Sequence, residues 1–134
     1  MRFNLEIRDI EGAKRIILPM FSRQSRSFGR IEAVIDTGAP KTILCARDAL
    51  RLNIPLANLD SETPLTGLGR GKVPVLLIKN FAFSLRNTEG EPVVLSMELL
   101  VVDVPSIRKE GQEKLNNALR IPTLIGMDFL EKNN

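Results

Sequence analysis

The segment Ala33-Val34-Ile35-Asp36-Thr37-Gly38-Ala39 places an acidic residue directly after an apolar run that is typical of a buried strand. Burying a lone carboxylate costs several kcal/mol or forces it to take up a proton, and proteins tolerate this where the acid has a chemical role. The plainer interpretation is an Asx-turn at a strand end. Asp-Thr-Gly or Asp-Ser-Gly occurs by chance in about one chain in twenty of this size, so the rest of the chain has to decide.

Short apolar and alternating segments on both sides of Asp36 predict a fold made mostly of strands. We expect strands at residues 3–8, 16–21, 31–35, 42–44, 73–85, 92–104 and 121–126, the first of them half-buried through Phe3, Leu5 and Ile7. Helical spacing predicts short helices at 46–52 and 127–131, while 106–119 suits a helix or an ordered loop and 56–64 a connecting loop. About ten short strands with one or two short helices predict an all-β fold, a closed barrel or a sandwich, and residues 1–134 are expected to form a single domain.

The composition narrows the possible chemistry to carboxylates. The 134 residues include no histidine and one cysteine, which excludes Ser-His and Cys-His nucleophiles, histidine zinc sites and an internal disulfide. The single thiol, Cys45, follows two apolar residues and is expected in the core. No second acid stands at metal-ligand spacing near Asp36, so we expect neither a metal nor a cofactor, with a carboxylate metal site kept as an alternative.

Charge and hydropathy argue against two classes of partner. Lys and Arg total 19 against 16 Asp and Glu, and a net charge of +3 spread along the chain does not favour nucleic acid. The first residues hold no uninterrupted apolar run, and no stretch approaches the length needed to cross a bilayer. We therefore expect no signal peptide and no membrane segment. Together with the single cysteine, this predicts a cytoplasmic location.

A second motif is the glycine-rich stretch Thr66-Gly67-Leu68-Gly69-Arg70-Gly71-Lys72-Val73. A dinucleotide-binding loop needs a strand before it and a helix after it, whereas here prolines flank the stretch and a β-rich segment follows. Nucleotide binding is therefore disfavoured. The stretch predicts the tip of a β-hairpin that closes over a ligand, and a hairpin that is only flexible remains the alternative.

The third motif is Thr123-Leu124-Ile125-Gly126-Met127-Asp128-Phe129-Leu130. Two apolar residues, a glycine and a short amphipathic turn indicate a strand end packed where there is no room for a Cβ. On its own this would be an ordinary junction between a strand and a helix.

Together and in this order, the three motifs resemble the retropepsin-like aspartic proteases, with one lobe of the enzyme per chain. The resemblance implies a homodimeric endopeptidase acting on a peptide or protein substrate, in which Asp36 pairs with its copy. The two carboxylates would share a proton, activate a water molecule and protonate the developing oxyanion. It further implies that Thr37, Gly38 and Ala39 form the active-site loop and the substrate cleft, that Gly67, Leu68, Gly69, Arg70 and Gly71 form a flap, and that Thr42, Gly126 and Asp128 give structural support.

The sequence also departs from the retroviral pattern. Pro40 stands where retroviral members often carry a substrate-binding acid, and residues 103–120 are longer than the corresponding segment. Four residues follow Leu130, so the dimer is expected to form without the C-terminal strand of the retroviral enzymes, or with one built differently. A protein of the same fold that binds peptides or other proteins without cleaving them is the alternative function.

Overall fold

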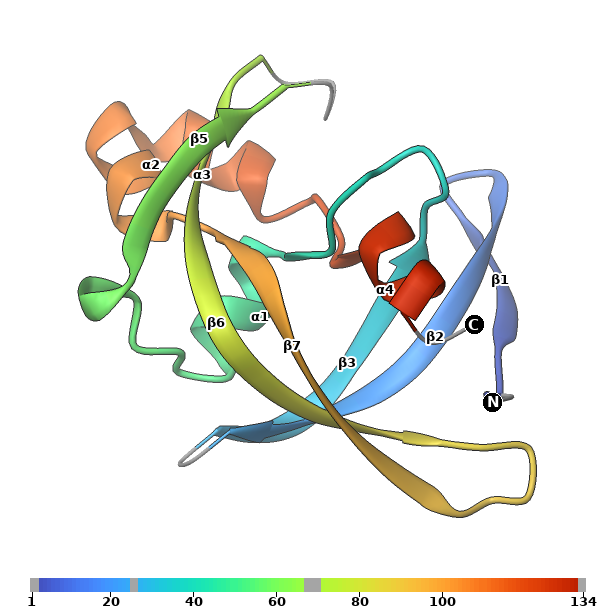
Figure 1. The fold of residues 1–134 in the computed structure, drawn as a ribbon. Coiled ribbons are helices and arrows are strands. Elements are labelled where there is room, and N and C mark those ends of the chain that lie inside the picture. The colour runs from blue at the N-terminus through green and yellow to red at the C-terminus, as the bar shows by residue number, and fades with distance from the viewer. Residues whose placement is uncertain (1–2, 25–26, 67–70, 133–134) are drawn as a thin grey trace.

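The computed structural model describes residues 3–24, 27–66 and 71–132 (Figure 1). Within these ranges the chain forms eight β-strands, four α-helices and one 3₁₀ helix. The strands are β1 (Glu6–Ile10), β2 (Ala13–Gln24), β3 (Ser27–Ile35), β4 (Ile43–Leu44), β5 (Asp60–Leu65), β6 (Val73–Arg86), β7 (Pro92–Val102) and β8 (Leu124–Ile125). The helices are α1 (Ala46–Arg51), η1 (Leu56–Asn58), α2 (Val104–Glu110), α3 (Gln112–Ala118) and α4 (Met127–Lys132).

The strands form one mixed sheet that closes on itself. Their order is β1-β2-β3-β8-β4-β7-β6-β5, and an additional pairing of β2 with β6 completes a ring. Two parallel pairs, Val34 with Leu124 and Ile43 with Leu100, insert β8 and β4 between the long hairpins. The expectation of a mainly β, closed architecture is therefore confirmed, and β1 and β5 are left as the two outer strands.

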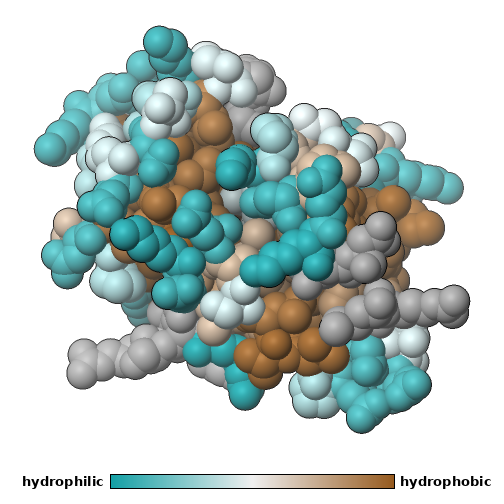
Figure 2. Space-filling model, in the orientation of Figure 1, coloured by the Kyte–Doolittle hydropathy of each residue, from teal (hydrophilic) through white to brown (hydrophobic). Residues whose placement is uncertain are grey.

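The main core fills the inside of this ring. It includes Leu18, Ile31, Phe81, Phe83 and Phe129, each no more than 2% exposed. Phe83 and Phe129 pack with their ring centroids 6.0 Å apart, which ties α4 to the inner face of the sheet. On the face shown in Figure 2, hydrophobic residues reach the surface in separate patches between hydrophilic ones.

The expected helix or ordered loop at 106–119 is a pair of helices with clear local causes. The Asp103 side chain caps α2, accepting hydrogen bonds from the Ser106 amide at 3.2 Å and from its hydroxyl at 2.7 Å. Gly111 separates α2 from α3 with a φ of +123°, which residues with a side chain rarely adopt. Both helices cover a second buried cluster that contains Val75, Val104 and Ile107.

Helices α1 and α4 lie close to their expected positions, whereas three other features differ from what the sequence predicted. The sequence predicted a loop at 56–64, but β5 forms there by pairing with β6, and its side chains are mostly exposed. The half-buried first strand is instead exposed, with Ile7 at 76% and Leu5 at 51%. Strand β1 pairs only with β2, so no neighbouring element of the described chain covers these side chains. Four α-helices also exceed the one or two expected.

No helix in the described ranges is both long enough and apolar enough to cross a membrane.

Candidate active site

Asp36 begins a tight loop directly after β3. Its backbone amide donates to the carbonyl of Ile125 at 2.9 Å, so the start of the loop is hydrogen-bonded to the neighbouring strand β8. Its carboxylate oxygen Oδ1 accepts a hydrogen bond from the Gly38 amide at 3.0 Å, and its carbonyl accepts one from the Ala39 amide at 3.1 Å. A half-buried carboxylate with a fixed orientation therefore stands at the end of a buried strand.

The residues after Asp36 lie near the surface. Thr37 and Gly38 are exposed, and Ala39 is half-buried. The Thr37 hydroxyl has no hydrogen-bond partner among the described residues. A Cβ at position 38 would lie 3.3 Å from Asp36 Oδ1, so the glycine lets the loop close around the carboxylate.

Gly126 supports this loop from below. A Cβ on Gly126 would lie 2.5 Å from the carbonyl carbon and oxygen of Lys41 and 2.8 Å from the carbonyl oxygen of Ala39. The first amides of α4 continue the contact, since Met127 N donates to the Ala39 carbonyl at 2.8 Å and Asp128 N to the Pro40 carbonyl at 3.1 Å. The start of α4 therefore packs backbone to backbone against residues 39–41.

Thr42 and Asp128 close the same arrangement with side chains. Asp128 accepts the Thr42 hydroxyl proton at 2.7 Å and the Thr42 amide proton at 3.1 Å, one on each carboxylate oxygen. The Thr42 hydroxyl oxygen in turn accepts from the Gly126 amide at 3.1 Å. The structure thus brings Asp36, Thr42, Gly126 and Asp128, predicted as one site from distant parts of the sequence, into one assembly.

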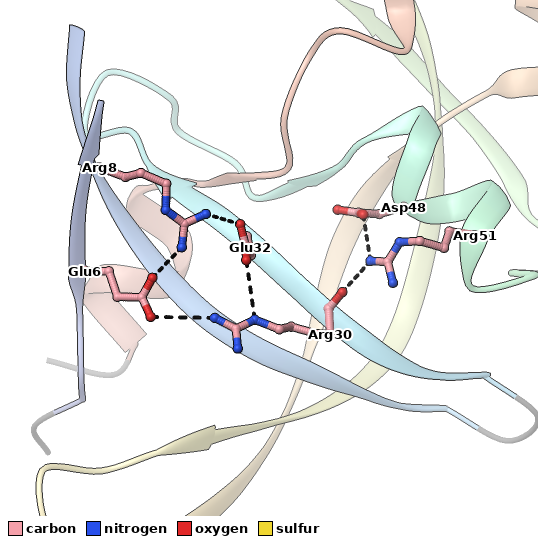
Figure 3. Close-up of polar contacts among 6 residues, drawn as sticks. All are labelled: Glu6, Arg8, Arg30, Glu32, Asp48 and Arg51. Atoms are coloured by element: carbon pink, nitrogen blue, oxygen red, sulfur yellow. Dashed lines mark hydrogen bonds and ion pairs between the residues drawn. The ribbon is translucent and has the colours of Figure 1, made fainter. Parts of the chain in front are cut away.

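A second threonine–aspartate pair lies at the other end of β8, where Thr123 precedes the strand, and sequence reasoning missed it. The Thr123 hydroxyl donates to Asp48 at 2.7 Å and accepts from the Cys45 amide at 3.0 Å. Asp48 also forms an ion pair with Arg51 at 2.9 Å (Figure 3). The only sequence signal was an acid among the apolar positions of a short helix, which could have marked Asp48 as a residue needing a buried partner.

The two strands on either side of the predicted flap are part of the described chain. Gly67, Leu68, Gly69 and Arg70 lie outside the described residues. The strands that flank them, β5 and β6, pair antiparallel and meet at Leu65 and Val73. Gly71 has a φ of +72° and open space around its Cα, as suits a turn.

A groove of about 750 Å³ runs beside Asp36. Its apolar wall includes Ile17, Val34 and Leu124, which form a small buried cluster of their own. Further lining comes from Ile121 and other residues between α3 and β8. The groove therefore combines an acid, an apolar wall and an opening to solvent.

Charged residues on the outer sheet face above this groove are joined in a network. Glu6, Arg8, Arg30 and Glu32 alternate in sign, and each arginine contacts both glutamates (Figure 3). All four side chains are at least 39% exposed, so the network contributes little to the free energy of unfolding. Its consequence for the groove is that Arg8 and Glu32 neutralise each other.

Two further observations concern metal binding and cysteine chemistry. Within residues 3–24, 27–66 and 71–132, no three His, Cys, Asp or Glu side chains gather as metal ligands would. Cys45 is fully buried, and burial, helped by the charge of Asp48, raises the pKa of its thiol to about 11. A thiol that stays protonated at neutral pH is a poor nucleophile.

Comparison with solved structures identifies this architecture. EIAV protease complexed with the inhibitor HBY-793 superposes with a TM-score of 0.55 and 17% identity over 93% of both chains. The fold is retropepsin-like. A retropepsin-like aspartic protease from Rickettsia conorii also matches, with a TM-score of 0.55 and 22% identity over 98% of this chain and 85% of that one. No family model and no curated protein sequence matches the chain.

At these identities the retropepsin-like likeness concerns the fold, and the expected family is supported at that level. The roles assigned to Asp36, Thr37, Gly38 and Ala39 remain predictions, as do those of the flap and of Thr42, Gly126 and Asp128.

Proposed function

We propose that the chain is a homodimeric aspartic endopeptidase that hydrolyses peptide bonds with water activated by Asp36 and its copy. The observation that carries this proposal is the position of the Asp36 carboxylate, which is fixed at a strand end, half-buried, and beside a groove with an apolar wall. The retropepsin-like fold supports the same conclusion.

The reaction would follow from two carboxylates held in contact. Two carboxyl groups in contact cannot both be ionised, because their negative charges repel each other, so the pair holds one proton. The ionised carboxylate takes a proton from a water molecule, whose oxygen attacks the peptide carbonyl carbon, while the protonated one donates to the carbonyl oxygen, which gives a tetrahedral diol. The proton taken from water then passes to the amide nitrogen, the C–N bond breaks, and one diol hydroxyl returns its proton to the pair as the new carboxyl group forms. The Gly38 amide, bonded to Asp36 Oδ1, fixes the orientation of the carboxylate before substrate arrives.

One chain supplies one such acid, so the proposal requires two copies. The exposed hydroxyl of Thr37 is available for a contact across the two-fold axis. Strand β1 is an outer strand of the sheet. Exposed apolar side chains lie directly before it at Leu5, on it at Ile7 and on β2 at Ile16. Surfaces of this kind support association with a second copy.

Cleavage can be tested with purified protein and a mixture of peptides from a digested proteome, analysed by mass spectrometry. We expect the unaltered chain to generate new termini and Asp36→Asn to generate none. Asp60→Asn is a matched control, because Asp60 is an exposed carboxylate on β5 outside the groove, and it should cleave normally. Equal cleavage by Asp36→Asn would refute the assignment, and peptide binding without cleavage would favour the non-catalytic binding protein.

The dimer can be tested by sedimentation over a range of concentrations. We expect a concentration-dependent dimer that Ile7→Lys weakens, because Ile7 is 76% exposed on β1. Val94→Lys is the control, since Val94 is also exposed, at 57%, but lies on β7. A chain that stays monomeric at all concentrations, with and without a statine-type inhibitor, could not assemble the pair of acids.

A further inference from the structure

The groove beside Asp36 has an excess of positive side chains that the fold leaves unpaired. Four arginines line it, and Arg8 is held by the glutamate network described above. The other three, Arg15, Arg47 and Arg120, form no ion pair with any described residue. The acids of the groove without an ion pair among the described residues are Glu11 and Asp36 itself.

These three arginines come from separate parts of the fold. Arg15 is on β2, Arg47 on α1 and Arg120 in the connection that follows α3. All three are exposed, so their charged groups are accessible to a ligand in the groove. Guanidinium groups bind carboxylates with two parallel hydrogen bonds, which makes arginine well suited to recognising an acidic side chain.

Arg15 also lies in register with the apolar wall. Arg15 and Ile17 are two residues apart on β2, so their side chains are on the same face, about 7 Å apart along the strand. Ile17 is opposite Val34 on β3, directly before Ile35 and Asp36. Ile17 is buried, at 1% exposure, so Arg15 is the exposed side chain on this face of β2. A peptide that lies in the groove beside Asp36 therefore passes the Arg15 guanidinium group.

We propose that the substrates of this chain carry an acidic residue within three positions of the cleaved bond, and that Arg15 and Arg120 recognise it. The inference rests on the proposed function, because it names the substrate class of that site. Asp and Glu are ionised at neutral pH, and an acidic substrate meets more unpaired positive than negative charge along this groove.

The experiment uses one peptide that the chain cleaves, resynthesised with Asp, Asn or Lys at each of three positions on either side of the cleaved bond. At one position we expect kcat/KM to follow the order Asp, Asn, Lys, with about two- to fivefold between steps, the usual range for exposed charge pairs. Raising the salt concentration should reduce these ratios, since exposed charges are screened.

Charge reversal gives the second measurement. Arg15→Glu with Arg120→Glu should invert the order, so that the Lys peptide becomes the better substrate. Arg23→Glu is the matched control, because Arg23 is an exposed arginine on the same strand β2 but does not line the groove, and it should keep the original order.

The outcomes separate this inference from the proposed function. Cleavage that depends on Asp36 but shows no acidic preference at any position, or an order that the double variant leaves unchanged, would overturn the inference alone. If the double variant does not fold, the inference is tested by the unaltered protein alone, through the order of kcat/KM for the Asp, Asn and Lys peptides and its dependence on salt. Cleavage that does not depend on Asp36 would overturn the proposed function instead.

Discussion

The hydroxyl of Thr123 donates to the carboxylate of Asp48 over 2.7 Å, and this bond joins α1 to the start of β8. Both residues are buried, at 3% and 4% exposure. The Thr123 carbonyl accepts the Val34 amide proton at 2.8 Å, two residues before Asp36. The pair therefore supports the strand on which the Asp36 loop begins.

Replacing Thr123 with valine should destabilise the chain without changing its fold. Valine keeps the shape of threonine but leaves Asp48 with fewer hydrogen bonds in a buried site, so we expect a loss of about 1–3 kcal/mol in the free energy of unfolding. Urea denaturation measures this loss. Thr123→Ser restores the hydroxyl and should recover most of it; a Thr123→Val variant as stable as the unaltered chain would show that the bond contributes nothing.

The Thr42–Asp128 pair should be energetically coupled, because each side chain is the main partner of the other. Thr42→Val removes the hydroxyl that donates to Asp128 at 2.7 Å and accepts from the Gly126 amide at 3.1 Å. Asp128→Ala removes the acceptor of both the Thr42 hydroxyl and the Thr42 amide. The double variant should then lose less than the sum of the two, by about 1–3 kcal/mol for residues in direct contact. Chemical denaturation of the four proteins gives the coupling, and additive losses would contradict it.

Changing the two glycines of the site to alanine should affect different properties, stability for Gly126 and cleavage for Gly38. Gly126→Ala places a methyl group 2.5 Å from the Lys41 backbone, which cannot move without displacing residues 39–41, so we expect a loss of about 3 kcal/mol or more. Gly38→Ala meets only the end of the Asp36 side chain at 3.3 Å. That variant should stay folded.

Measurements of both stability and cleavage distinguish the two glycines. Gly38→Ala should keep its urea midpoint within a small margin while kcat falls, because the carboxylate is displaced from its fixed orientation. In Gly126→Ala, by contrast, the urea midpoint itself should fall. Equal loss of stability in the two variants would show that the Cβ position does not decide the effect.

Much of the fold and part of the site could be predicted, because their signals are local. The apolar run before Asp36 predicted the end of β3, and the Ile125-Gly126 pair predicted a close approach that the structure places under residues 39–41. Strand β5 was missed because its residues are polar and exposed, so only pairing with β6 makes it a strand.

The Asp48–Thr123 pair could not be predicted for a different reason. Its members are 75 residues apart in the sequence, and although Thr123 begins the third motif, that motif gives its side chain no partner. Their contact depends on β8 inserting between β3 and β4, a topological fact that hydrophobic periodicity does not contain. The charges of the groove were likewise assembled from β2, α1 and the connection after α3.

Cys45 should make the stability of the chain fall at alkaline pH. Burial raises the pKa of the folded thiol from its ordinary value of 9.0 to about 11, so between these pH values the unfolded chain loses this proton and the folded chain keeps it. The contribution is complete below pH 9 and is lost as the pH rises to about 11, by roughly 2–3 kcal/mol. Urea denaturation of the unaltered chain and of Cys45→Ala from pH 8 to 11 tests this prediction. The variant has the same lysines and other titratable groups as the unaltered chain but lacks the thiol. The difference in unfolding free energy between the two proteins should shrink as the pH rises, and a difference that stays constant would mean that the folded thiol ionises as easily as the unfolded one.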